Sequence, residues 1–306
     1  ATIAANQIIM GLEWDEYKTV YITPFEHNAI ARPLHLMKER YNFEIVLLPF
    51  DSQTQEFDRE EAEKLFSQNP PDYVFVNHVS NVTGAIVPIE AITELAKQHD
   101  AIVVVDASQS AGLESLNMKK SNIDYVIFAG HKNLYASWGI GGFVSASAAH
   151  LTTALAGGTG SDSLNLNMAS DSPAGFEVGS ANIIAISSLN ASLKWLKTTG
   201  MSVISDKKAQ LMERLIQGLM DIGVKLYLPT HHTSVLSFNV GGYIANDIGT
   251  ILSEEYDVAV RTGYHCAPYI HDLIDSHEYG GTVRVSVGYF NTEEDIDLLL
   301  DGIRSL

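Results

Sequence analysis

Short runs of β-forming residues alternate with helical patterns through the first half of the chain. The apolar residues of 2–13 and of 89–98 recur at helical spacing, and the run at 59–69 begins with acidic residues, which favour a helix start. The runs that read as strands are TVYI at 19–22, DYVFVN at 72–77, AIVVVDA at 101–107 and DYVIFAG at 124–130. Strands separated by helices are typical of a parallel sheet with crossover helices, so we predict an α/β fold.

The pattern changes beyond about residue 195. A long helix is followed by strand-like VLSFNV at 235–240, a helix at 247–257, strand-like TVRVSVG at 282–288 and a terminal helix at 293–303. This order indicates a smaller α+β domain. We therefore predict a large domain at 1–198 and a small one at 199–306.

Composition narrows the class of protein. The chain has 306 residues, of which 46% are hydrophobic and 18% charged, as in globular proteins. A formal charge of −18 opposes binding to nucleic acid, whose affinity comes largely from basic residues that neutralise phosphates. Because no apolar run approaches the roughly 20 residues that span a bilayer, and the start lacks a basic signal region, we expect a cytoplasmic protein without membrane contact.

Three polar residues follow predicted strands, where ligands of α/β sheets bind: Asn81, Asp106 and Lys132. A carboxylate delivered by a buried strand needs a cationic partner, and a protonated pyridine nitrogen would be one. Gln109, three residues after Asp106, could reach a neighbouring ring oxygen. An ordinary acidic turn with a helix cap explains Asp106 as well. A lysine beside His131 at a strand end suits a Schiff base, because burial and nearby positive charge promote its deprotonation.

Two other interpretations compete around these residues. Gly139, Gly141 and Gly142 resemble a dinucleotide loop, but their spacing is not GxGxxG and no suitable acidic residue follows. Cys266 is the only cysteine, so it is either a buried filler or a reactive thiol. With His265 and His271 it also forms a possible zinc cluster, which lacks a second cysteine and the usual ligand spacing, so we expect no metal.

These segments resemble class V aminotransferase-like enzymes that use pyridoxal-5′-phosphate (PLP), and more closely the group II cysteine desulfurases. The strongest matches are AVRTGYHCAPYIH at 259–271 and GTVRVSVGYFNTEED at 281–295. The resemblance implies the PLP-dependent transferase fold type I, with the cysteine loop in the small domain. It also implies that Cys266 accepts sulfur and that Arg284 binds the substrate carboxylate.

The resemblance carries over to further positions one by one. It implies that Lys132 forms the Schiff base, that His27 stacks on the cofactor ring and takes part in catalysis, and that Asn81 also touches substrate. The implied cofactor contacts are Thr2, His27, Asn81, Asp106, Gln109, His131, Lys132 and Ser180. Of these, Asp106 would pair with the pyridine nitrogen, Asn81 and Gln109 would reach the ring oxygen, Thr2 and His131 the phosphate, and Ser180 the phosphate of a partner subunit.

The chain departs from the family pattern in two places. Ala129 stands where the family often has a serine or threonine, so one phosphate hydroxyl is missing. The family also has several tens of residues before the phosphate turn, whereas this chain starts inside that turn. We therefore expect that an N-terminal segment is lacking.

The implied activity is conversion of L-cysteine to L-alanine with a persulfide on Cys266, in a homodimer that passes sulfur to an acceptor protein. The thiolate is the attacking form, and His265 or Arg261 could stabilise it. A cysteine or cystine C–S lyase, a selenocysteine lyase or an aminotransferase would use the same cofactor residues. A noncatalytic, truncated protein of this fold is the remaining alternative.

Overall fold

The computed structural model describes residues 1–146, 151–160, 163–169 and 173–306. The chain divides into two compact units. The first unit comprises Ala1–Leu48, Arg59–His78 and Pro88–Thr198, and the second comprises Pro49–Asp58, Val79–Val87 and Thr199–Leu306. The two short segments of the second unit fall within the range predicted for the large domain, 1–198, and the predicted domain division stays a prediction.

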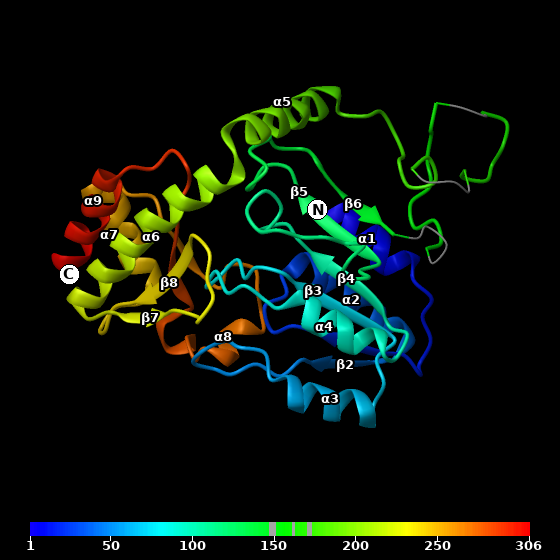
Figure 1. The fold of residues 1–306 in the computed structure, drawn as a ribbon, viewed down its shortest axis with the longest axis horizontal. Coiled ribbons are helices and arrows are strands. Elements are labelled where there is room, and N and C mark those ends of the chain that lie inside the picture. Colours follow the sequence, from blue (N-terminus) through cyan, green and yellow to red (C-terminus); the bar gives the residue numbers. More distant parts are fainter. Residues whose placement is uncertain (147–150, 161–162, 170–172) are drawn as a thin grey trace. The chain divides into compact units, whose positions relative to one another are not determined.

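The first unit is built on a six-stranded sheet (Figure 1). Its strands are β1 Thr19–Ile22, β2 Glu44–Leu47, β3 Tyr73–Asn77, β4 Ile102–Asp106, β5 Tyr125–Ala129 and β6 Gly141–Ser145. Its helices are α1 Thr2–Gly11, α2 Asn28–Tyr41, α3 Arg59–Gln68, α4 Ile89–Lys97 and α5 Ile183–Thr199, which ends at the boundary. The strand order is β2-β1-β3-β4-β5-β6, and every pair is parallel except β5 with β6.

The direction of the crossovers reverses within this sheet. The chain passes from β1 through α2 to β2, and then from β2 through α3 back across β1 to β3. Because such connections are right-handed, α2 and α3 cover opposite faces of the sheet. Helix α1 packs against α2, and α3 packs against α4. This arrangement confirms the predicted α/β fold with a mainly parallel sheet and helices on both faces.

The central strands are buried on both faces. All residues of β3 are buried, and so are all of β4 except its first, which explains their uninterrupted apolar sequences. The glycine-rich stretch after β5 is not a nucleotide-binding loop but begins the antiparallel edge strand β6. A Cβ atom at Gly141 would approach the carbonyl oxygen of Phe128 to 2.9 Å, so close strand packing accounts for that glycine.

The second unit is the smaller α+β part, as predicted. Its sheet has the order β7-β8-β10-β9 and is antiparallel throughout. Its strands are β7 Lys225–Tyr227, β8 Val235–Asn239, β9 Arg261–Gly263 and β10 Thr282–Ser286. Its helices are α6 Met201–Ile222, α7 Ala245–Tyr256, α8 Ile270–Leu273, the 3-10 turn η2 His277–Tyr279 and α9 Glu293–Arg304.

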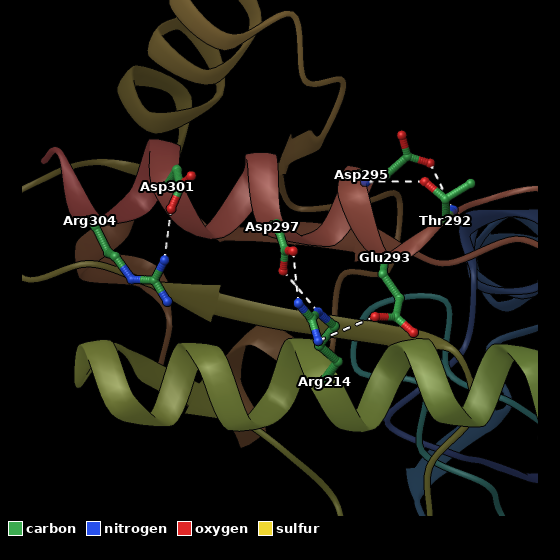
Figure 2. A network of polar contacts seen from close by, with 7 residues as sticks. All are labelled: Arg214, Thr292, Glu293, Asp295, Asp297, Asp301 and Arg304. Atoms are coloured by element: carbon green, nitrogen blue, oxygen red, sulfur yellow. Dashed lines mark hydrogen bonds and ion pairs between the residues drawn. The ribbon is translucent and has the colours of Figure 1, made fainter.

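Helix α9 lies along α6 and closes the core of the second unit. The apolar core includes Leu215, Leu236, Phe238, Leu252 and Val283. At the surface, Arg214 of α6 donates two hydrogen bonds to Asp297 of α9, at 2.8 and 2.7 Å, and pairs with Glu293 (Figure 2). Among the described residues, no helix is both long and apolar enough to cross a bilayer.

Candidate functional site

The predicted site residues of the first unit follow the carboxyl ends of neighbouring strands. His27 follows β1, Asp106 ends β4, and Lys132 comes three residues after β5. Parallel strands deliver these ends to one edge of the sheet. The strand order reverses between β1 and β3, and a reversal of this kind opens the crevice in which α/β sheets bind ligands.

Asp106 presents a buried carboxylate at this edge. Its side chain is only 6% exposed, and Oδ1 accepts a hydrogen bond of 2.8 Å from the backbone N–H of Ser108. The strand register places Asp106 directly beside Asn77, the last residue of β3. A buried anion in this position is suited to hold a cationic ligand atom.

Lys132 lies in a tight turn after β5. The backbone N–H of Gly130 donates to Ile140, and the N–H of Ala136 donates back to Gly130. A Cβ atom at Gly130 would come within 2.5 Å of the Ile140 side chain, so the turn requires glycine there. Lys132 is half-buried within this turn. A lysine held in this way could bond a carbonyl cofactor covalently.

His131, which directly precedes Lys132, stacks on Trp138. Their ring centroids lie 4.5 Å apart, with an angle of 13° between the planes. Partial burial and the neighbouring Lys132 lower the pKa of His131. The imidazole is therefore biased toward the neutral form, in which it recognises an anion as a single hydrogen-bond donor rather than as a charge.

His27 is fixed by its role as the N-cap of α2. Its Nδ1 accepts a hydrogen bond of 3.0 Å from the backbone N–H of Ala29. Gln109 is half-buried, and its backbone oxygen accepts from the side-chain amide of Asn133. Thr2 is exposed in the first turn of α1, and Ser180 is exposed just before α5.

Glu26 was missed by the sequence analysis although it directly precedes His27. Its side chain is fully buried, and burial raises its pKa to about 8, assisted by the nearby charge of Asp106. The only signal in the sequence is an acidic residue between Phe25 and His27, four residues after a strand. That signal cannot tell a buried carboxyl group from an exposed one.

The second unit brings together Asn81, Cys266 and Arg284. The antiparallel register of β9 and β10 sets Arg261 directly opposite Arg284, so the two side chains project from the same face. Nη2 of Arg261 donates to Sγ of Cys266 over 3.3 Å. Nη1 of Arg284 donates to the backbone oxygen of Asn81 over 2.8 Å.

The backbone that carries Cys266 is held in an unusual conformation. His265 and Cys266 have φ values of 50° and 58°, in the left-handed region that non-glycine residues rarely adopt. His265 anchors this turn: Nε2 lies 3.0 Å from the backbone oxygen of Thr282, and its own backbone oxygen accepts from Nδ2 of Asn81 over 2.8 Å. Such strain persists where the surroundings fix it, and it is concentrated at functional sites.

The electrostatics decide which neighbour can stabilise a Cys266 thiolate. Burial, together with the charge of Arg284, lowers the pKa of His265 to about 3, so its imidazole is neutral near pH 7. Of the two candidates left open by the sequence, Arg261 is therefore the cationic one and also the hydrogen-bond donor. Burial and the adjacent Arg261 lower the pKa of Arg284 to about 10, which still leaves its guanidinium charged.

Among the described residues, three buried atoms around Cys266 have no hydrogen-bond partner: Nε of Arg284, Oδ1 of Asn81 and Nδ1 of His265. A buried polar atom without a partner costs stability unless a ligand completes it. The cluster is therefore prepared for an anionic group with both donors and acceptors, such as an amino acid. Among the described residues, no group of three or more His, Cys, Asp or Glu could hold a metal ion.

Comparisons with known proteins point in one direction. The family model for aminotransferase class-V proteins matches residues 1–299. A protein of Pyrococcus abyssi named "Probable cysteine desulfurase" is 30% identical over 98% of this chain and 76% of its own length. A cysteine desulfurase of Yersinia pestis is 30% identical over 94% of this chain and 71% of its own length. An apo structure of cysteine desulfurase from Thermococcus onnurineus superposes with a TM-score of 0.88 at 28% identity, covering 99% of this chain and 76% of that one.

Proposed function

We propose that this chain, which belongs to the aminotransferase class-V family, is a PLP-dependent cysteine desulfurase that converts L-cysteine to L-alanine and takes the sulfur as a persulfide on Cys266. Family membership confirms the resemblance found in the sequence. The relatives named cysteine desulfurase support the activity. The single observation that carries it is the hydrogen bond from Arg261 to the Cys266 sulfur, in an electropositive cluster that includes Arg284.

The residues of the first unit fit PLP. The buried Asp106 carboxylate would hold the pyridine nitrogen, Gln109 the ring oxygen, and His27 the ring face. Lys132, half-buried in the turn after β5, would bond the cofactor covalently. The first turn of α1, at Thr2, has free backbone N–H groups that suit the phosphate, with His131 as a further donor. PLP, when bound, supplies an electron sink for negative charge that develops on the substrate α-carbon.

The other steps fall to side chains of this chain. Arg284 would pair with the substrate carboxylate, for which the guanidinium fork is well matched, and Asn81 would contact the bound substrate. Nζ of Lys132 would remove the α-proton and later return a proton to the product carbon. The Cys266 thiolate would attack the substrate sulfur, so that an S–S bond forms as the C–S bond breaks. Cysteine and the enzyme thiol thus give alanine and an enzyme persulfide.

The test is persulfide and alanine formation from L-cysteine by the wild-type protein and by Cys266→Ser. We expect the variant to keep the cofactor absorbance, because no cofactor contact is assigned to Cys266, and to lose persulfide formation. Alanine release at the wild-type rate in the variant would instead favour a C–S lyase or selenocysteine lyase. Loss of PLP binding in the variant would show that Cys266 is misplaced in this proposal.

We also propose a homodimer. Trp138, Ile183 and Ile184 are 81%, 72% and 82% exposed, and the segment before Trp138 is tied to α5 by a hydrogen bond from Ser137 to Ser188. A cluster of exposed apolar residues of this kind supports an interface. Ser180, exposed beside it, would reach the partner subunit's phosphate. Sedimentation equilibrium that gives a monomer with tight PLP binding would contradict the proposal.

The persulfide implies a partner. Cys266 is only half-buried, so an acceptor thiol can approach its sulfur, and we propose an acceptor protein in this role. The cytoplasmic location stays a prediction.

A further inference from the structure

We propose that Glu26 is a positioning residue of the first unit. Its carboxyl group, in the neutral form, ties the loop that carries His27 to the end of β3 beside Asp106, and so fixes the two groups that would contact the PLP ring. The inference rests on the proposed function only for the identity of the cofactor.

The hydrogen bonds of Glu26 join two strand ends. Oε1 accepts from the hydroxyl of Thr23 and from the backbone N–H of Asn77, both over 2.7 Å. The side-chain amide of Asn77 donates in return to the backbone oxygen of Phe25 over 2.6 Å. The loop after β1 is therefore bonded to the end of β3 in both directions, at the point where the strand order reverses.

The same bonds connect Glu26 to both ring contacts. Asn77 pairs directly with Asp106 in the sheet, and the backbone N–H of His78 donates to the backbone oxygen of Asp106 over 3.1 Å. On the other side, His27 follows Glu26 in the chain and caps α2. A displaced Glu26 would therefore move the imidazole and the carboxylate relative to each other. Neither shift requires Glu26 to touch the cofactor.

The neutral form follows from the surroundings of the carboxyl group. Burial and, less strongly, the charge of Asp106 together raise the pKa of Glu26 to about 8, although hydrogen bonds from Thr23 and Asn77 oppose the shift. Within the part of the chain that the structure describes, no donor reaches the buried Oε2, so none stabilises a full charge on that oxygen. A second negative charge at Glu26 would be repelled by the nearby carboxylate of Asp106. A neutral acid keeps the hydrogen bonds and leaves the negative charge to Asp106.

The experiment compares Glu26→Ala with the neutral isostere Glu26→Gln. The readouts are the dissociation constant of PLP from the apo protein and the visible circular dichroism of the bound cofactor, which reports a fixed ring orientation. We expect Glu26→Ala to weaken PLP binding by about tenfold and to reduce the dichroism, because Asn77 loses a buried acceptor. Glu26→Gln should stay within about twofold of wild type, since an amide can accept the same two bonds.

Ile92→Ala, in the buried face of α4, serves as a matched control that destabilises the first unit away from the strand ends. It should leave both readouts unchanged at temperatures where the protein is folded. If Glu26→Ala does not fold, Thr23→Val removes one of the two bonds and should weaken PLP binding severalfold.

Two outcomes would overturn the proposal. If Glu26→Gln binds PLP as poorly as Glu26→Ala, the group acts as an anion. If the Glu26→Ala or Thr23→Val protein matches Ile92→Ala in both readouts, the role is only structural. A wild-type protein that binds PLP but forms no alanine from cysteine would contradict the proposed function instead, and the comparison of variants would still decide the role of Glu26.

Discussion

The two units prepare opposite charges by different structural means. In the first unit, parallel strands end at one edge of the sheet and bring the carboxyl groups of Glu26 and Asp106 together. In the second unit, antiparallel register sets the guanidinium groups of Arg261 and Arg284 opposite each other. Like charges in such proximity destabilise a fold unless something relieves the repulsion.

The relief differs between the two units. In the first unit Glu26, the more deeply buried of the two acids, takes up a proton, so one negative charge remains for a cationic ring nitrogen. Arginine cannot lose its proton readily, so both charges persist in the second unit. There each guanidinium group donates a hydrogen bond, Arg261 to the Cys266 sulfur and Arg284 to a backbone oxygen, and a substrate carboxylate would supply the opposite charge. The first unit is thus suited to bind a cationic group and the second to bind anionic groups.

The largest expected effect comes from Lys132→Ala, which breaks the first unit's chemistry and spares the second. Alanine formation should fall by about 10⁴-fold, because both covalent attachment and proton transfer are lost. The lysine-dependent cofactor absorbance should vanish while thermal unfolding is little changed, since Lys132 is only half-buried. Retained turnover of cysteine would remove Lys132 from its assigned role.

The next largest effects are expected from the two arginines of the second unit. Arg284→Ala should lower kcat/KM for cysteine by about 10- to 100-fold through loss of a charge-assisted contact to the carboxylate. Arg261→Ala should instead slow alkylation of Cys266 by iodoacetamide at neutral pH, because the thiolate loses its donor.

Arg214→Ala is the matched control, since Arg214 also makes a two-pronged carboxylate contact but on the surface between α6 and α9 (Figure 2). It should leave kcat/KM unchanged and change the thermal unfolding temperature little, because exposed ion pairs contribute little to stability. Unchanged kinetics in Arg284→Ala would exclude that residue from the site.

The smallest expected effect is on the pH dependence of stability. The contribution of His265 is lost as the pH falls, and the contribution of Glu26 is lost as the pH rises. The folded-state pKa of His265 is lowered to about 3 from 6.5, so unfolded chains bind the proton first and stability is lost as pH falls below about 6.5. At pH 5 the loss relative to His265→Gln should be about 2 kcal/mol. The pKa of Glu26 is raised to about 8 from 4.5, so its contribution is lost as pH rises between those values.

Urea unfolding of the wild type, of His265→Gln and of Glu26→Gln, measured at pH 5 and pH 8, checks both directions of the pH dependence. The contributions of other titrating groups cancel in the difference between the wild type and each variant. Among them is His78 of the first unit, whose pKa burial lowers to about 4. Parallel pH trends for wild type and variant would contradict the corresponding assignment.

Much of the first unit could be predicted because its signals are local. Continuous apolar runs predict the strands β3, β4 and β5. The positions of Asp106 and Lys132 at the ends of strands can be predicted from where two of those runs end. Helix α2 was missed, since it contains Pro33 and carries many polar residues. Strands β7 and β9 have only three residues each, too few for a periodic pattern.

The place of Asn81 could not be predicted from local pattern. Its segment, Val79–Val87, belongs to the second unit through long-range bonds, such as that from the Ser237 hydroxyl to the backbone oxygen of Val82. The hydrogen bond between Arg261 and Cys266 likewise depends on a turn in which two residues, His265 and Cys266, adopt the left-handed conformation. Neither residue is a glycine, so the sequence does not indicate this conformation. Long-range contacts in the folded chain, rather than the local sequence, determine where Asn81 and Cys266 lie.

The short strand β9 makes the cluster around Cys266 sensitive to insertions and deletions. Side chains alternate between the faces of a strand, so removing Thr262 alone would turn Arg261 to the opposite face while every functional residue remained in the chain. A gene carrying such a deletion would still encode the cysteine and both arginines. Judging whether a distant homologue is active therefore requires counting the residues between Arg261 and Cys266 as well as identifying them.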